Sequence, residues 1–231
     1  MTAYALIHGA GSDSWYWHLA AAELRRRGHE VVSPDLPCDD DAAGLAEYAD
    51  VVVDAVGDRS GVVVVAQSLG GFTALLVCER VDAGLLVMLN AMVPYPGESP
   101  GEWWESTGWT GRPLETGQDF MEVFFHDVPE DVAAEGMKRG RPQSGTPFER
   151  PWPLDEWPRV PTVFLVGRGD RFFPARFQQR VLRERLDTAA EEIDGGHLIA
   201  LSRPKELADR LERYAARRGD ARVPEFTARR R

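Results

Sequence analysis

The stretch from residue 61 to residue 71 reads GVVVVAQSLGG and passes from an apolar, β-branched run into a helical pattern at Ser68. A serine on such a sharp strand-to-helix turn approaches its neighbours closely, so the residues two before and two after it must be small. Ala66 and Gly70 occupy those positions, where the usual pattern has glycine at both. The motif predicts a nucleophilic Ser68, with the amide of Leu69 as a donor to a developing oxyanion. The alternative is an ordinary turn in which the serine only caps a helix.

The amino-terminal segment YALIHGAG, residues 4–11, is an apolar strand that runs into small residues. Glycines at a strand end let the backbone bend over a bound oxygen, so we expect the amide of Ala10 to be the second oxyanion donor. A dinucleotide-binding glycine loop is the alternative, but the third glycine is missing from the required place. We expect His8 to shape this loop and not to transfer protons.

Two turns near the carboxyl-terminal end carry the groups that a serine nucleophile needs. The turn GRGD ends at Asp170 and the turn DGGH ends at His197, and each turn follows a predicted strand. An imidazole must take the serine's proton, and a carboxylate must fix the tautomer of that imidazole. Taken alone, Asp170 could be a solvated turn residue and His197 a capping or core histidine. Asp194 is a rival acid, but it precedes the histidine by only three residues in the same turn.

Taken together, these segments resemble one known family. The chain is similar to the α/β-hydrolases, and more narrowly to the small-esterase branch that includes plant methyl-ester esterases, hydroxynitrile lyases and their bacterial relatives. The stretches that carry the resemblance are LIHGA at 6–10, AQSLGG at 66–71, GRGD at 167–170 and GGH at 195–197. The chain order Ser68, Asp170, His197 is the order found in that family. The resemblance implies a catalytic triad of these residues and a cap over the pocket.

Two positions differ from the lyases of this branch. The resemblance implies that the plant hydroxynitrile lyases use a threonine hydroxyl just after the first strand and a lysine directly after the histidine, to hold cyanide. This chain has Gly9 and Leu198 there, so a released anion would meet no cation. These departures favour an esterase-like mechanism over cyanohydrin cleavage. The serine at position 68, in place of an aspartate, also argues against the dehalogenase relatives.

Apolar runs and helical spacings alternate along the chain. We expect strands near residues 3–8, 30–33, 62–66, 85–90, 162–166 and 190–193. We expect helices near residues 15–27, 44–56, 69–80, 174–187 and 203–217. The strands are apolar throughout, which is typical of a parallel sheet covered on both faces. The predicted fold class is therefore α/β, with a mostly parallel central sheet and helices on both faces.

The interval between the fourth and fifth expected strands is long and proline-bounded. We predict a core of residues 1–93 and 158–218 and a small cap insertion of residues 94–157. The insertion is rich in aromatic residues, namely Trp103, Trp104, Trp109, Phe120, Phe124 and Phe125. Such a roof suits an apolar or aromatic substrate group, although the same side chains could simply pack the cap onto the core. Residues 219–231 are predicted to be a disordered tail, with a docking segment as the alternative.

Composition limits the partners. The net charge of −10 at pH 7 disfavours nucleic acid and anionic membranes. No apolar run is long enough to span a bilayer, and no signal-peptide pattern opens the chain. Cys38 and Cys78 are the two cysteines, which fits a reduced, cytoplasmic setting. We expect no cofactor, and no metal because neither H-x-x-x-H nor paired-cysteine spacing occurs. The expected partner is a small-molecule ester, and the sequence leaves a homodimer open.

The sequence therefore predicts a serine hydrolase that cleaves a small carboxylic ester with an apolar or aromatic portion through an acyl-enzyme. Ser68 would attack the carbonyl, His197 would act first as base and then as acid, and Asp170 would orient the imidazole. One alternative is a lyase or cyclase of a natural-product pathway that uses His197 as a general base. The other is a non-catalytic small-ligand binding protein of the same fold, against which an intact triad argues.

Overall fold

The computed structural model describes residues 1–111 and 114–227. Its centre is a six-stranded sheet in the order β2-β1-β3-β4-β5-β6, and every neighbouring pair of these strands is parallel. The strands are β1 (Ala3–Ile7), β2 (Glu30–Val32), β3 (Val62–Gln67), β4 (Ala83–Leu89), β5 (Thr162–Gly167) and β6 (Glu191–Ile193). The predicted α/β fold class is confirmed.

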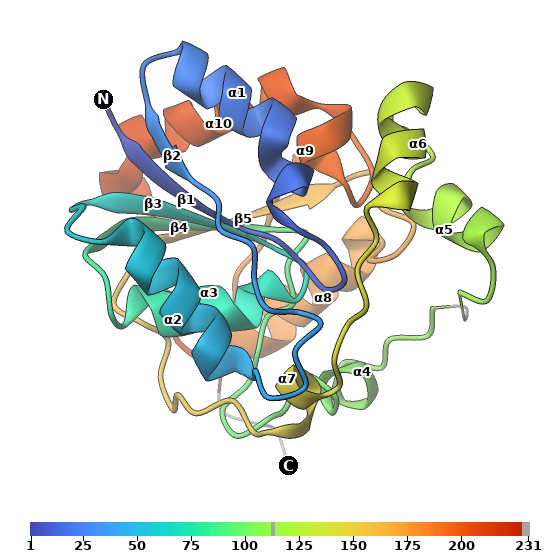
Figure 1. The fold of residues 1–231 in the computed structure, drawn as a ribbon. Coiled ribbons are helices and arrows are strands. Elements are labelled where there is room, and N and C mark those ends of the chain that lie inside the picture. The colour runs from blue at the N-terminus through green and yellow to red at the C-terminus, as the bar shows by residue number, and fades with distance from the viewer. Residues whose placement is uncertain (112–113, 228–231) are drawn as a thin grey trace.

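Helices cover both faces of this sheet (Figure 1). One face carries α1 (His18–Arg26), α9 (Ile199–Ser202) and α10 (Pro204–Ala216). The other face carries α2 (Leu45–Val56), α3 (Gly70–Cys78) and α8 (Ala175–Leu186). The expected helices near 15–27, 44–56, 69–80, 174–187 and 203–217 correspond to the five longer ones of these, while the four-residue α9 has too few turns to produce a periodic signal.

Alternating side chains of the central strands divide the core in two. Val62, Val64 and Ala66 of β3 pack in a cluster with side chains of α2 and α3. Val63 and Val65 of the same strand pack in a second cluster with side chains of α1 and α10. Successive side chains of a strand point to opposite faces, so a strand covered on both sides must be apolar at every position. This requirement explains the unbroken valine run that precedes Ser68.

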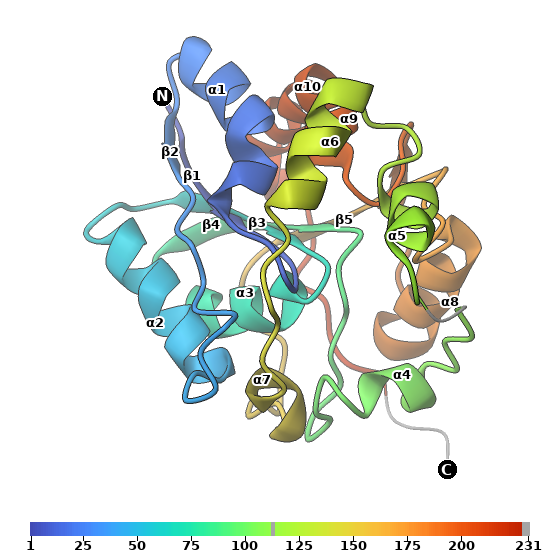
Figure 2. The ribbon, with the colours of Figure 1, turned by 45° about the vertical axis from the view of Figure 1, so that its right-hand side comes forward.

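In the described part of the chain between β4 and β5, the insertion contains the short helices α4 (Trp103–Ser106), α5 (Gly117–Phe124), α6 (Glu130–Lys138) and α7 (Thr146–Glu149). Figures 1 and 2 show α5 and α6 on the side of α9, and α4 and α7 on the opposite side of the molecule. These helices occupy the interval that the sequence assigns to a cap. The insertion lines the cavity described below together with the loops at the carboxyl ends of the strands.

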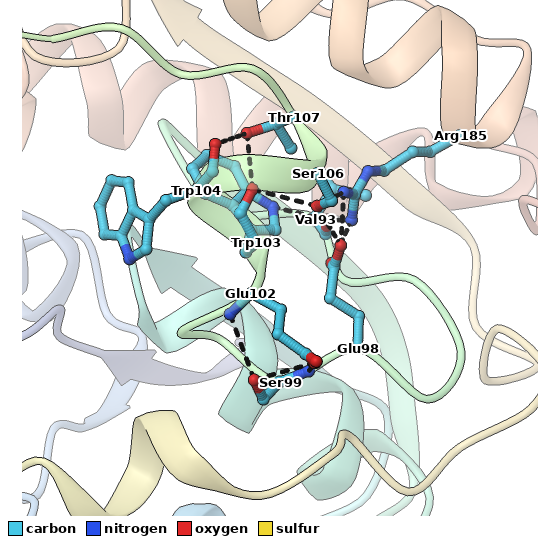
Figure 3. Close-up of polar contacts among 9 residues, drawn as sticks. All are labelled: Val93, Glu98, Ser99, Glu102, Trp103, Trp104, Ser106, Thr107 and Arg185. Atoms are coloured by element: carbon cyan, nitrogen blue, oxygen red, sulfur yellow. Dashed lines mark hydrogen bonds and ion pairs between the residues drawn. The ribbon is translucent and has the colours of Figure 1, made fainter.

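A buried ion pair joins the segment before α4 to α8 (Figure 3). Arg185 Nη1 lies 2.5 Å from Glu98 Oε2 and Arg185 Nη2 lies 2.8 Å from Glu98 Oε1, and their side chains are only 9% and 2% exposed. The same guanidinium donates to the carbonyl of Val93 at 2.8 Å and to Ser106 Oγ at 2.9 Å. The Trp103 indole donates to the Val93 carbonyl as well, at 2.9 Å. This network fixes the first part of the insertion on the core.

The carboxyl-terminal segment differs from the sequence expectation of a disordered tail. Contacts from residues 221–227 reach the core, where the amide of Thr162 donates to the carbonyl of Arg222 at 2.9 Å. Phe226 supplies the apolar contact, because its ring lies 5.7 Å from that of Trp157. A single aromatic residue in a polar segment is a weak signal, so composition alone favoured disorder. The last four residues of the predicted tail lie outside the described part of the chain.

Candidate active site

Ser68 stands on a sharp turn between β3 and α3. Its backbone has φ of +53°, a conformation that a residue with a side chain rarely adopts. The amides of Gly71 and Met92 hold the turn by donating to the Ser68 carbonyl at 3.0 and 2.9 Å. A Cβ atom at Gly70 would lie 2.8 Å from the His8 carbonyl oxygen, and one at Gly71 would lie 2.3 Å from that of Met92. Close backbone approach therefore explains the two glycines that follow the serine.

The loop after β1 packs directly on this turn. A Cβ atom at Gly9 would lie 2.8 Å from the Cβ of Ser68 and 2.5 Å from Gln67 Oε1. His8 supports the loop from beneath, because its Nδ1 donates to the Gly9 carbonyl at 2.8 Å while its Nε2 accepts from the Leu36 amide at 3.0 Å. Burial lowers the pKa of His8 and keeps the ring neutral, as this bonding requires. The geometry gives His8 a supporting role in the loop.

His197 and Asp170 form a buried hydrogen-bonded pair. His197 Nδ1 donates to Asp170 Oδ2 at 2.7 Å, and the two side chains are 3% and 0% exposed. The other carboxylate oxygen, Oδ1, accepts from the amides of Phe172 and Phe173, both at 2.8 Å. A carboxylate accepts only, so the imidazole proton stays on Nδ1 and the lone pair is on Nε2. This is the tautomer that a general base for a serine hydroxyl needs.

The rival acid, Asp194, lies in a different environment. Its side chain is 69% exposed and forms an ion pair with Arg168 on the surface. The Asp170 side chain, by contrast, is fully buried against the imidazole. Burial and contact with His197 thus favour Asp170 as the orienting acid.

Asn90 joins the loops that carry the acid and the histidine, and sequence reasoning missed it. It follows β4 with φ of +44° and is fully buried. Its Nδ2 donates to the carbonyls of Gly196 and His197 at 3.0 and 3.2 Å, while its Oδ1 accepts from the Gly167 amide at 2.7 Å. The available signal was a lone polar residue at the carboxyl end of an apolar strand, where parallel sheets place their sites.

Three phenyl rings surround the imidazole of His197. The ring centroids of Phe172, Phe173 and Phe124 lie 5.2, 5.3 and 5.4 Å from it, all at steep angles. Phe172 and Phe173 belong to the loop of Asp170, whereas Phe124 is the last residue of α5 in the insertion. The rings keep water from the sides of the imidazole and limit its rotation.

A cavity of about 590 Å³ opens beside Ser68 and His197. Ala10 and Leu69, whose amides are the predicted oxyanion donors, line it as well. The insertion contributes the predicted aromatic side chains Trp104, Phe120, Phe124 and Phe125, and also Phe148. The other two aromatic residues of the predicted roof have structural contacts, since Trp103 is buried on the core and the Trp109 indole donates to the Phe172 carbonyl at 3.1 Å. The insertion therefore supplies much of the aromatic surface of the cavity, together with the polar side chains of Arg139, Arg141 and Gln143.

Two arginines at the cavity already have acidic partners. Arg139 lies 3.7 Å from an Asp13 carboxylate oxygen and 2.8 Å from one of Glu135. Arg141 pairs with Asp39. Both guanidinium groups are thus paired with this chain's own carboxylates at partly exposed positions. Within residues 1–111 and 114–227, no group of three or more His, Cys, Asp or Glu side chains is arranged to hold a metal ion. The same residues contain no helix that is both long and apolar enough to cross a membrane.

Comparison with known proteins agrees with this fold. The chain is 26% identical to a probable esterase, PIR7A, of Oryza sativa subsp. indica, over 93% of this chain and 97% of that one. It is 24% identical to an alpha-hydroxynitrile lyase of Arabidopsis thaliana, over 92% and 96% of the two chains. The structure of a pyrethroid hydrolase from Sphingobium faniae JZ-2 superposes with a TM-score of 0.77 at 20% identity, over 95% and 99% of the chains. The model of the alpha/beta hydrolase family matches residues 5–210, so the chain belongs to that family.

Proposed function

We propose that this protein is a serine hydrolase that cleaves a small carboxylic ester with an apolar or aromatic portion. The observation that carries the proposal is the buried His197–Asp170 pair, because the imidazole of His197 lines the same cavity as Ser68. Ester hydrolysis is supported by the relatives named esterase.

The reaction follows from the bonding of the site. Ser68 Oγ attacks the ester carbonyl while His197 Nε2 takes the hydroxyl proton, and Asp170 stabilises the imidazolium that forms. The amides of Ala10 and Leu69 hold the oxyanion of the tetrahedral intermediate. His197 then gives its proton to the departing alcohol, which leaves an acyl group on the serine. Water, deprotonated by the same imidazole, attacks the acyl group and restores the free hydroxyl.

The lining of the cavity supports an uncharged, apolar substrate. Trp104, Phe120 and Phe124 offer aromatic surface on the side of the insertion. Arg139 and Arg141 have carboxylate partners at partly exposed positions, which offset part of their charge. These features favour a neutral ester over a substrate with a free carboxylate.

Lyase chemistry is the second candidate, because one relative is named a hydroxynitrile lyase. The crowding at Gly9 leaves no room for a side-chain hydroxyl there without a shift of the loop, and Leu198 lines the cavity directly after the histidine. A cyanide ion released in this apolar space would be unpaired, at a cost of several kcal/mol. We expect mandelonitrile to be turned over at the background rate while aryl or aliphatic esters are cleaved well above it.

Active-site labelling tests the proposal. A fluorophosphonate probe should modify Ser68 in the folded protein, and peptide mapping should locate the adduct. An activated ester should produce a burst of alcohol followed by slower turnover, which identifies the acyl-enzyme. A non-catalytic binding protein would produce neither signal, and a lyase or cyclase that uses His197 as a base would produce no burst. A cyanohydrin rate equal to the best ester rate, and lost in Ser68→Ala, would overturn ester hydrolysis.

A further inference from the structure

A short segment of the insertion contacts both loops of the candidate triad. It runs from Phe124 at the end of α5 through His126 and Asp127, before α6 begins at Glu130. We call residues 124–127 the α5–α6 junction. Its two polar side chains are largely withdrawn from solvent, at 11% and 15% exposure. The segment lies outside the residues that carry out the proposed chemistry.

Each polar side chain of the junction bonds to one loop of the triad. Asp127 Oδ2 accepts from the amide of Gly196, the residue directly before the candidate base, at 2.8 Å. His126 Nε2 lies 2.9 Å from the carbonyl oxygen of Gly169, the residue directly before the candidate acid. A carbonyl only accepts, so His126 donates this bond. The two side chains also meet each other, with 3.4 Å between His126 Nδ1 and Asp127 Oδ1.

The two loops also bond to each other and to the sheet. The Gly169 amide donates to the Gly195 carbonyl at 2.9 Å, and Asn90 bonds to both loops through its side chain. A Cβ atom at Gly196 would lie 2.7 Å from Asp127 Oδ1 and 2.8 Å from His126 Cε1. The glycine loop therefore fits closely between Asn90 and the junction.

We infer that His126 and Asp127 are positioning residues, which hold the loops of Asp170 and His197 at the spacing that proton transfer requires. The inference rests on the proposed function for the reaction that it would affect. Catalytic groups must keep their geometry within a fraction of an ångström, and a misplacement of about 1 Å can cost about a hundredfold in rate. Phe124 and Phe125 of the same junction line the cavity, so the surface that receives the substrate and the groups that hold the triad are consecutive in the chain.

Asp127→Ala and Asp127→Asn separate positioning from simple structural support. Alanine removes the acceptor for the Gly196 amide, so we expect kcat to fall about 10-fold to 100-fold with KM changed less than about threefold. Asparagine keeps an acceptor oxygen and should restore kcat to within about threefold of the native value. The matched control is Asp131→Ala, which removes an exposed carboxylate from the first turn of α6 and should leave kcat unchanged.

A substrate-free measurement distinguishes failure of this inference from failure of the proposed function. The proton on His197 Nδ1 should produce a downfield NMR resonance in the native protein and in Asp127→Asn, and a weakened or lost one in folded Asp127→Ala. If Asp127→Ala does not fold, His126→Ala serves instead and should weaken the same resonance and lower kcat. Native kcat and an unchanged resonance in a folded variant would overturn the inference. An equal loss in Asp131→Ala would overturn it as well.

Discussion

Two regions of the insertion, one beside α4 and one at the α5–α6 junction, are fastened by polar side chains of low solvent exposure, but to different parts of the core. In the region beside α4, which we call the α4 end, Glu98 pairs with Arg185. Arg185 belongs to α8, a helix whose residues take no part in the proposed reaction. At the α5–α6 junction, His126 and Asp127 bond to the loops of the candidate acid and base. Similar contacts should thus have different consequences. Loss of the contact with α8 should affect the stability of the fold, whereas loss of the contacts with the loops of Asp170 and His197 should affect the geometry of proton transfer.

The intact ion pair at the α4 end adds little net stability, but the loss of either partner is expected to be costly. Removing two charges from water is costly, and their mutual attraction often does no more than offset that cost. Glu98 and Arg185 are nevertheless fully bonded, with the Val93 carbonyl and the Ser106 hydroxyl completing the set. Loss of one partner would leave an uncompensated buried charge, which is the costly case. We therefore expect this end to govern stability and the junction to govern rate.

The largest effect should come from the triad, and it sets the scale for the effects expected at the α4 end and at the junction. Ser68→Ala and His197→Ala should each lower kcat by at least about a thousandfold, and the double variant should be no worse, because base and nucleophile act as one unit. Ester turnover at saturating substrate measures this.

The acid of the triad has its own control. Asp170→Asn should be severe, since the amide leaves the imidazole in the wrong tautomer. Asp194→Asn changes an exposed side chain and should leave kcat within about twofold. Unchanged turnover in Ser68→Ala, or a severe loss in Asp194→Asn with a silent Asp170→Asn, would contradict the assignment.

The second effect concerns the α4 end and should be seen in stability. Arg185→Met leaves Glu98 buried without its partner, so we expect the free energy of unfolding to fall by about 3 to 5 kcal/mol. Adding Glu98→Leu should recover much of that loss, because an apolar pair replaces an unpaired charge. Urea denaturation measures both changes. The kcat of the folded protein should stay near the native value. A large fall in kcat would show that the α4 end and the junction do not differ as argued.

Much of this arrangement could be predicted from the sequence, because the signals were local. The valine run before Ser68 predicted a strand buried on both faces, and the small residues around the serine predicted the sharp turn that the structure has at φ +53°. Asp170 and His197 could be placed at one edge of the sheet because each followed a strand. The lone Asn90 was not recognised, since its partners are backbone groups that are distant in sequence.

The sequence indicated a long interval between two expected strands, but it did not indicate the contacts of that interval. Its helices are short, and α4 and α7 have four residues each, too few for a helical period to show. The Glu98–Arg185 pair joins residues 87 positions apart, and Asp127 meets Gly196 across 69 positions. Pairings of this kind depend on the tertiary fold, so neither the α4 end nor the junction could be assigned a role before the fold was known.

The third prediction compares one cavity-lining aromatic residue of the junction with one of α4. Phe124 of the junction packs on the His197 ring, so Phe124→Ala should lower kcat about tenfold by loosening the imidazole. Trp104 of α4 packs on Trp109 and on Phe172, so one ring separates it from the imidazole, and Trp104→Ala should mainly raise KM. Steady-state kinetics with one aryl ester measures both variants. Equal effects on kcat and KM in the two variants would remove the distinction between the α4 end and the junction.

The smallest effect is the pH dependence of stability, and it sharpens the comparison because the junction contains a histidine. Burial, and then the charge of Arg171, lower the pKa of His126 below its usual value of 6.5, although Asp127 and Asp170 raise it in part. Burial likewise lowers the pKa of His8. In the unfolded chain both rings take up protons near pH 6.5, whereas in the folded protein they do so only at lower pH. The unfolded state therefore binds more protons just below pH 6.5, and the free energy of unfolding should fall as the solution is acidified through that range.

Substitution of each ring tests this sign. His126→Gln keeps a donor for the Gly169 carbonyl, and His8→Gln keeps an acceptor for the Leu36 amide, but neither glutamine titrates. Each variant should therefore show a shallower dependence of unfolding free energy on pH than the native protein, measured by urea denaturation from about pH 7.5 to about pH 5.5. If His126→Gln retained the full native slope, the histidine of the junction would not be linked to folding.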